Sequence, residues 1–153
     1  MKNLICKDYE IVNYSEKYFK EILENLKVFQ KKAKMIGYEN NIEQELKKEL
    51  KKATHVLMTI DKQRNDKIIW VACFEIKGDK CDMSLGFKND DYEWRSSLKS
   101  IQKIFNLILR LSNAKFITCK ISRTKKKAGF VWVLKKFYKV KFLDNDNVQF
   151  FKN

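Results

Sequence analysis

Apolar residues recur at intervals of three and four along four stretches of the chain, which is the period of an amphipathic helix. The first stretch covers about residues 15–34, and its first residue is a serine whose hydroxyl can cap the helix. A second covers about residues 42–50, and its lysine- and glutamate-rich outer face indicates a solvated surface. The third, about residues 96–111, is apolar over most of its circumference, which predicts a helix packed deep against a sheet. The fourth covers residues 125–137.

Between these helices lie runs rich in β-branched and aromatic residues, as strands are. Three runs follow one another, at residues 55–60, 68–76 and 81–87, and Gly78-Asp79 predicts a hairpin turn between the last two. Residues 8–15 are expected to form a loop. Four further strands are predicted at residues 4–7, 116–121, 139–143 and 148–151. This order predicts an α+β fold in which helices flank a mixed, mostly antiparallel sheet, as a single domain over residues 1–153.

Composition narrows the class of protein. With 44% apolar residues the chain can bury a core, which excludes wholesale disorder. No apolar run approaches the roughly 20 residues that cross a membrane, and the N-terminus becomes charged before a signal-peptide core develops. We therefore expect no membrane partner and no secretion through a signal peptide. The single histidine, His55, and four cysteines without C-x-x-C spacing exclude the usual zinc sites, so we expect no metal and buried, reduced cysteines.

Positive charge is concentrated toward the C-terminal end. The chain has 33 Lys and Arg against 19 Asp and Glu, a net charge of +14, and residues 115–153 alone hold 11 basic and 2 acidic residues. A surface of this kind attracts nucleic acid or acidic protein. The alternative is a lysine-rich composition that only keeps the surface solvated.

The order of elements resembles that of the GNAT superfamily of acyl-CoA N-acetyltransferases over nearly the whole chain. Within it, the stretch from Trp94 through the third predicted helix to residues 131–137 resembles the GNAT-like proteins of tailed bacteriophages. These include a small internal virion protein of short-tailed phages. The shared features are a Trp-Arg start to the long helix, a basic outer face on it, and a C-terminal tail that ends in a strand. The resemblance implies a GNAT-like fold.

The resemblance also defines where a cofactor would bind. In the GNAT family the fourth strand is followed by a loop of the form Gln/Arg-x-x-Gly-x-Gly/Ala, whose backbone N–H groups cradle the pyrophosphate of acetyl-CoA. Here the matching residues 88–97 contain no glycine and include three acidic residues. Only the start of the next helix suits an anion, and its candidate cofactor-binding residues are Arg95, Ser96 and Ser97.

The catalytic markers of the family are altered as well. The family's Asn-x-x-Ala segment reads Lys125-Lys126-Lys127-Ala128, and Trp132 or Val133 stands where a tyrosine acid is expected. The remaining candidates are two strand carboxylates that would act as general base and one nearby tyrosine that would act as acid, Glu75, Asp82 and Tyr138.

Two functions follow from these residues. The first is a phage-type GNAT-fold protein without acetyltransferase activity and without a cofactor, which acts as a virion-associated, binding or structural module. It would lie in the host cytoplasm or inside a virion, and its partners would be virion or host proteins, or nucleic acid. The alternative is a divergent acetyl-CoA-dependent N-acetyltransferase that acts on a protein or a small amine. The expected partner surface is a set of basic residues, Lys120, Arg123, Lys125, Lys126, Lys127, Lys135, Lys136 and Lys139.

Overall fold

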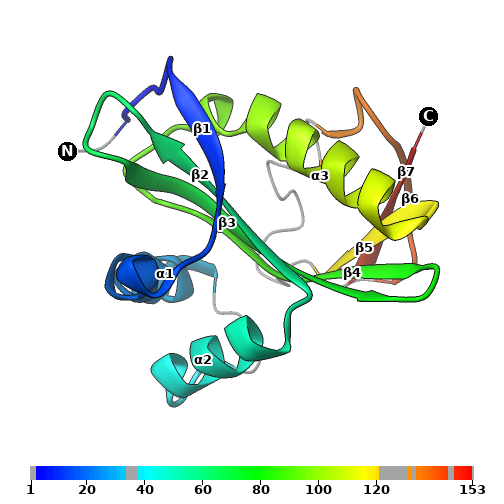
Figure 1. Ribbon diagram of the computed structural model, residues 1–153, viewed down its shortest axis with the longest axis horizontal. Coiled ribbons are helices and arrows are strands. Elements are labelled where there is room, and N and C mark those ends of the chain that lie inside the picture. Colours follow the sequence, from blue (N-terminus) through cyan, green and yellow to red (C-terminus); the bar gives the residue numbers. More distant parts are fainter. Residues whose placement is uncertain (1–2, 34–37, 121–130, 132–133, 145–146, 153) are drawn as a thin grey trace.

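A seven-stranded sheet forms the centre of the computed structural model, which describes residues 3–33, 38–120, 131, 134–144 and 147–152 (Figure 1). The strand order is β1-β2-β3-β4-β5-β7-β6. All neighbouring strands are antiparallel except β4 and β5, which are parallel. The strands are β1 (Tyr9–Asn13), β2 (His55–Asp61), β3 (Lys67–Lys77), β4 (Lys80–Lys88), β5 (Phe116–Lys120), β6 (Lys139–Phe142) and β7 (Asn147–Phe151).

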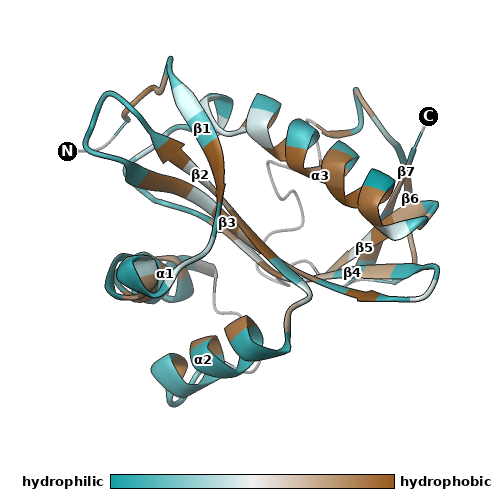
Figure 2. Cartoon of the chain, in the orientation of Figure 1, coloured by the Kyte–Doolittle hydropathy of each residue, from teal (hydrophilic) through white to brown (hydrophobic). Residues whose placement is uncertain are grey.

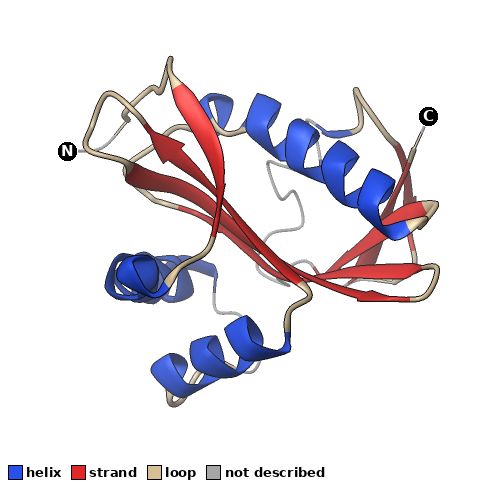
Figure 3. Cartoon of the chain, viewed as in Figure 1, coloured by secondary structure: helices blue, strands red, loops and turns tan. Residues whose placement is uncertain are grey.

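Helices cover both faces of this sheet (Figure 3). One face carries α1 (Phe19–Ala33), which a short 3-10 turn precedes, and α2 (Ile42–Lys52). The other face carries α3 (Leu98–Ser112), whose apolar positions are turned toward the sheet (Figure 2). The predicted mixed sheet between helices is therefore confirmed.

Each face of the sheet has its own core. Under α3 the core is aromatic, and the ring of Phe105 meets the edges of Phe74 and Phe150 at centroid distances of 6.0 and 5.6 Å. Under α1 and α2 the core is mainly aliphatic and includes the fully buried Leu26 and Leu46. Because successive residues of a strand point to opposite faces, β3 supplies both cores and is buried along most of its length.

The predicted first strand is wrong in position. Residues 4–7 do not form a strand, and only Leu4 makes an isolated parallel bridge, to Tyr92. The strand lies instead at Tyr9–Asn13, inside the segment expected to be a loop, and pairs with β2 along its whole length. As the edge of the sheet it is only half-buried, so it needs few apolar residues and carries a weak sequence signal.

The other predicted elements lie within a few residues of those observed. The third predicted helix begins at Leu98, after a 3-10 turn at Trp94–Ser96. Most of the predicted helix at residues 125–137 lies outside the described residues. Of that stretch, Val131 and Leu134 are buried in the core under α3.

Candidate functional site

The parallel strands β4 and β5 separate where β4 carries a bulge. The register pairs Cys73 with Leu85 but the next residue, Phe74, with Met83, so Ser84 is an extra residue on β4. Pairing with β5 covers Asp82 and Met83 and, among the described residues, goes no further. Among the described residues, no strand pairs with this side of β4 from Ser84 onward. We call this edge, residues 84–87, the β4 edge.

The bulge also changes which side chains face α3. Met83 belongs to the core under α3, whereas Leu85, two residues later, belongs to the core under α1 and α2. By alternation with Leu85 and Phe87, Gly86 faces the α3 side, where it pairs with Ala72. A Cβ atom built on Gly86 would lie 2.7 Å from Cε of Met83. Gly86 is therefore closely packed, and Met83 is the side chain that limits the space beside it.

The loop between β4 and α3 is held by its own backbone. Asn89 donates its N–H to Ile69 O and accepts at its own carbonyl the N–H of Tyr92. Such bonds commit most of the N–H groups that a bound phosphate would need. Six N–H groups between residues 89 and 97 donate to oxygen atoms of the protein itself, those of Asn89, Asp91, Tyr92, Glu93, Ser96 and Ser97.

A lysine ammonium lies inside this loop. Lys88, the last residue of β4, is buried and donates to the carbonyl oxygens of Asn89 (3.0 Å) and Tyr92. Its Nζ also lies 5.4 Å from the centroid of the Trp94 ring. Burial lowers the pKa of Lys88, although the charge of Asp90 opposes this shift. The loop therefore turns carbonyl oxygens inward toward a cation, which is the opposite polarity to a phosphate cradle.

The N-terminal segment fastens the loop from outside. Leu4 donates its N–H to Asp91 O (2.7 Å) and accepts the N–H of Glu93 (3.0 Å). The N–H of Cys6 donates to Oγ of Ser96 (2.9 Å). These contacts join the start of the chain to the loop, so the loop conformation does not depend on a ligand.

The predicted cofactor residues lie in one turn, at residues 94–97, but are already engaged. Nε of Arg95 pairs with Glu93 at 2.5 Å, and the Arg95 side chain is exposed. Ser96 and Ser97 are buried, and Oγ of Ser97 donates to Trp94 O (2.9 Å). The groups that remain for an anion are the first N–H groups of α3, which have no acceptor within the helix, and the exposed cation of Lys99.

The predicted catalytic residues lie on opposite sides of the sheet. Glu75 and Asp82 are paired across β3 and β4 and share the face that α2 covers, because Lys52 of α2 lies 3.4 Å from Glu75. A hydrogen bond from Lys77 lowers the pKa of Glu75 despite some burial. Tyr138 lies on the α3 side, where its hydroxyl contacts Asn106 Oδ1 (2.6 Å) and Gln102 O (3.0 Å).

Tyr138 is therefore placed away from both carboxylates. Burial raises its pKa to about 12, so it keeps its proton at neutral pH. The carboxylates are the two groups that the structure brings together, and Asp82 lies two residues before the bulge at Ser84. Their position at the start of the β4 edge is the feature that suits a general base.

The predicted basic surface is described only in part. Lys135, Lys136 and Lys139 are exposed, and Nζ of Lys135 lies 5.5 Å from the ring of Phe142. The side chain of Lys120 and the whole of residues 123–127 lie outside the described part of the chain. In that part, no three His, Cys, Asp or Glu residues gather as metal ligands, and no helix is long and apolar enough to cross a membrane. All four cysteines are buried and free, as predicted.

Sequence reasoning missed two features of the site, the buried Lys88 and the bulge at Ser84. A lysine at the end of an apolar strand, just before three acidic residues, reads as a surface charge because burial depends on how the loop folds back. The sequence hardly signals the bulge. Met83 and Leu85 are both apolar at strand spacing, and nothing indicates that they belong to different cores.

Comparison with known proteins identifies the fold. No protein-family model matches the sequence, and no curated protein matches it. A PaiA N-acetyltransferase from Thermoplasma acidophilum, solved with coenzyme A, is 15% identical with a TM-score of 0.70 over 96% of this chain and 100% of that chain. An N-acetyltransferase from Staphylococcus aureus Mu50 is 14% identical with a TM-score of 0.68, covering 96% and 98%.

A third structure is similar at the same level. It is a GNAT family acetyltransferase from Brucella melitensis in complex with acetyl-CoA, 12% identical with a TM-score of 0.64 over 95% of this chain and 88% of that chain. At such low sequence identity, the similarity to these structures concerns the backbone fold alone. With the bulged β4, its separation from β5 and the element order described above, the chain has the GNAT fold.

Proposed function

We propose that this protein is a divergent acetyl-CoA-dependent N-acetyltransferase that binds the pantetheine arm of its cofactor along the β4 edge. The observation that carries the proposal is that the described pairing of β4 with β5 ends at the Ser84 bulge, so no described strand pairs with the backbone donors and acceptors of residues 84–87. A pantetheine arm contains two amides, and amides pair with a free strand edge as another strand does. Structural neighbours with coenzyme A or acetyl-CoA support the same reading.

The residues present fit the pantetheine arm of the cofactor better than its pyrophosphate. The β4 edge suits the amides of the arm. The loop after β4 does not suit the pyrophosphate in the family's usual way, because its N–H groups are committed and its inward carbonyls hold Lys88. The first turn of α3, with its N–H groups and Lys99, is the remaining cationic position for the phosphates. We therefore expect weaker cofactor binding than a glycine-rich loop gives.

When bound, acetyl-CoA would supply an activated acetyl thioester. Attack on a thioester requires an amine that has lost its proton, so a base near the β4 edge is needed. We assign this role to Asp82, with Glu75 as the neighbouring carboxylate. Lys77 and Lys52 both pair with Glu75, which makes it the less available of the two. Tyr138 takes no part in this assignment, because its hydroxyl is bonded to α3 on the other side of the sheet.

The experiment is calorimetric titration with acetyl-CoA, using a variant that fills the edge and one that does not. Gly86→Val places two methyl groups beside the β4 edge. Gly78→Ala serves as the matched control, because φ at Gly78 is +62° and a side chain there strains the hairpin turn without approaching the edge. The proposal predicts that Gly86→Val weakens binding at least tenfold and that Gly78→Ala leaves it unchanged. No heat of binding at millimolar acetyl-CoA with the unmodified protein would overturn it.

One observation favours a second function, that of a non-catalytic binding module. The closed loop around Lys88 is complete without a ligand, and the N-terminal segment seals it. A GNAT fold that has lost its phosphate site would keep its sheet as a scaffold for protein partners. The phage and virion assignment belongs to this reading and stays a prediction. Absence of acetyl-CoA binding in the titration above would select it.

A further inference from the structure

A groove runs over the outer side of α3, between β1 and the C-terminal strands. It has a volume of about 710 Å³. We call it the α3 groove. The polar residues that line it are three cations and two amides, and an aromatic ring closes one side: Lys103, Arg110, Lys152, Gln102, Asn106 and Phe137. Tyr138 lies at its base, with its hydroxyl bonded to α3.

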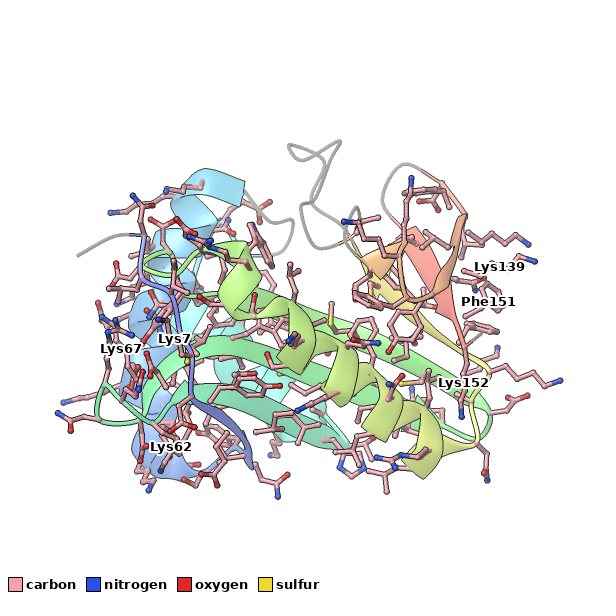
Figure 4. All side chains as sticks on the ribbon, turned by 90° about the horizontal axis from the view of Figure 1, so that it is seen from above. Lys7, Lys62, Lys67, Lys139, Phe151 and Lys152 are labelled. Atoms are coloured by element: carbon pink, nitrogen blue, oxygen red, sulfur yellow. The ribbon has the colours of Figure 1, made fainter. Side chains whose placement is uncertain are left out.

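The α3 groove is cationic without compensation by described acidic side chains. No carboxylate lines it, and α3 carries Lys99, Lys103 and Arg110 but no acidic residue. None of the three groove cations forms an ion pair with a described carboxylate. Beyond the groove the imbalance continues, since residues 95–153 hold 15 basic residues and 2 acidic ones. Residues 95–153 therefore carry most of the net positive charge of the chain, and Lys139 of β6 and Lys152, which follows β7, project into solvent (Figure 4).

The cations follow one stripe of the helix. Lys99, Lys103, Asn106 and Arg110 are separated by four, three and four residues, which keeps all of them on one face. All four are exposed. At 1.5 Å per residue the stripe is about 16 Å long. A stripe of this length matches an extended, multiply charged anion better than a single phosphate.

The other groups in the α3 groove favour unpaired bases. Asn106 Oδ1 is held by Tyr138, which fixes the amide in place, and Gln102 lies one helical turn away. Amides hydrogen-bond to the edges of unpaired bases. The Phe137 side chain is 38% exposed at the wall of the groove, and every base can stack on an aromatic ring. An acidic peptide would use the cations but has no use for a stacking surface.

We propose that the α3 groove binds single-stranded nucleic acid, with Lys103, Arg110 and Lys152 contacting phosphates and Phe137 contacting a base. None of the described residues that line the α3 groove belongs to the β4 edge, so this binding is independent of the proposed acetyl transfer. Its failure would leave the β4 edge and its cofactor untouched.

The test is fluorescence anisotropy of a labelled 20-nucleotide oligothymidylate with the full chain, from 50 to 300 mM NaCl. Lys103→Gln/Arg110→Gln removes two groove cations. Lys20→Gln/Lys48→Gln is the matched control, because it removes two exposed lysines from α1 and α2 on the opposite face and changes the net charge equally. Each lost phosphate contact lowers the slope of log K against log salt by about 0.7 for a single strand. We expect a slope smaller by about 1.4 and binding about tenfold weaker at 100 mM salt in the groove variant alone.

Three results would overturn the proposal. The first is no binding of the oligonucleotide at 50 mM salt. The second is an equal loss in the groove variant and the control variant, which would mean attraction by net charge without a site. The third is binding of a duplex or of polyglutamate as tight as that of the single strand. Binding that weakens steeply with salt and is lost only in the groove variant supports the proposal.

Discussion

Gly86 offers a direct perturbation of the β4 edge. Its replacement by alanine adds one methyl group, and the nearest atoms are Cε and Sδ of Met83 at 2.7 and 2.9 Å, followed by Cζ2 of Trp70 at 3.4 Å. The two short contacts involve the end of a flexible side chain, so Met83 can move aside at moderate cost. Trp70 is fully buried and cannot move as freely.

The expected cost follows from these contacts. Overpacking a core costs about 1–3 kcal/mol, and the two short contacts with the flexible end of Met83 place Gly86→Ala near the middle of that range. Replacing glycine by alanine also lowers the conformational entropy of the unfolded chain, which stabilises the folded state by about 0.4–1 kcal/mol. We expect a net loss of about 1 kcal/mol in the free energy of unfolding, which for a chain of this length lowers Tm by about 2–4 °C. Urea and thermal unfolding measure both quantities.

A second variant shows whether Met83 is the cause. Met83→Ala by itself leaves a cavity and costs about 2–5 kcal/mol. In that background the added methyl group at Gly86 has space, so Gly86→Ala should cost nothing further. If the full cost of about 1 kcal/mol persists when Met83 is alanine, the methyl group clashes elsewhere and the description of the β4 edge is wrong.

Three further predictions concern the groups that hold the loop after β4. Tyr92→Phe removes the hydroxyl that donates to the buried carboxylate of Asp61 (2.8 Å), so urea unfolding should show a loss of about 1.5–3 kcal/mol in the free energy of unfolding. If the losses caused by Tyr92→Phe and Asp61→Asn simply add in the double variant, this hydrogen bond is contradicted. Burial alone would raise the pKa of Asp61, but hydrogen bonds from Arg64 and Tyr92 lower it overall. The stability that Asp61 contributes is therefore present above its unfolded pKa of 3.8 and is lost as the pH falls through the lower folded pKa. Unfolding curves in acid should show that the wild type's free energy of unfolding approaches that of Asp61→Asn as the pH falls. Burial lowers the pKa of Lys88, so near pH 10 the unfolded state binds more protons than the folded state. The free energy of unfolding should therefore rise with pH toward 10.5. Urea unfolding at pH 8 and pH 10 measures this rise, which the Lys88→Met variant should lack.

Most of the fold could be predicted because its elements have strong periodic patterns. The runs at β2, β3 and β4 are dense in β-forming residues, and α3 is apolar on most sides because it lies over the centre of a large sheet. The edge strand β1 was missed because half of its residues face solvent. Edge position is a property of the whole sheet and leaves little trace in a window of five residues.

The site was less predictable, and for a physical reason. The absence of glycine in the β4–α3 loop indicates a loop unlike the family's phosphate cradle, but the committed N–H groups and the inward carbonyls depend on contacts with Leu4, about 90 residues away along the chain. The pairing of Glu75 with Asp82 followed from the hairpin. Tyr138 was placed near the site by sequence proximity to the fourth predicted helix, whereas its hydroxyl turns to α3.

Hydrogen exchange at the β4 edge tests the central claim most directly. Exchange of the full chain would be followed by mass spectrometry with and without millimolar acetyl-CoA, comparing a peptide that covers residues 84–88 with one that covers β1, an edge strand of the sheet. If the pantetheine arm pairs with β4, the amides of residues 84–88 should exchange more slowly with the cofactor while β1 is unchanged. Unchanged exchange at residues 84–88, or protection at β1 alone, would contradict a cofactor site at this edge.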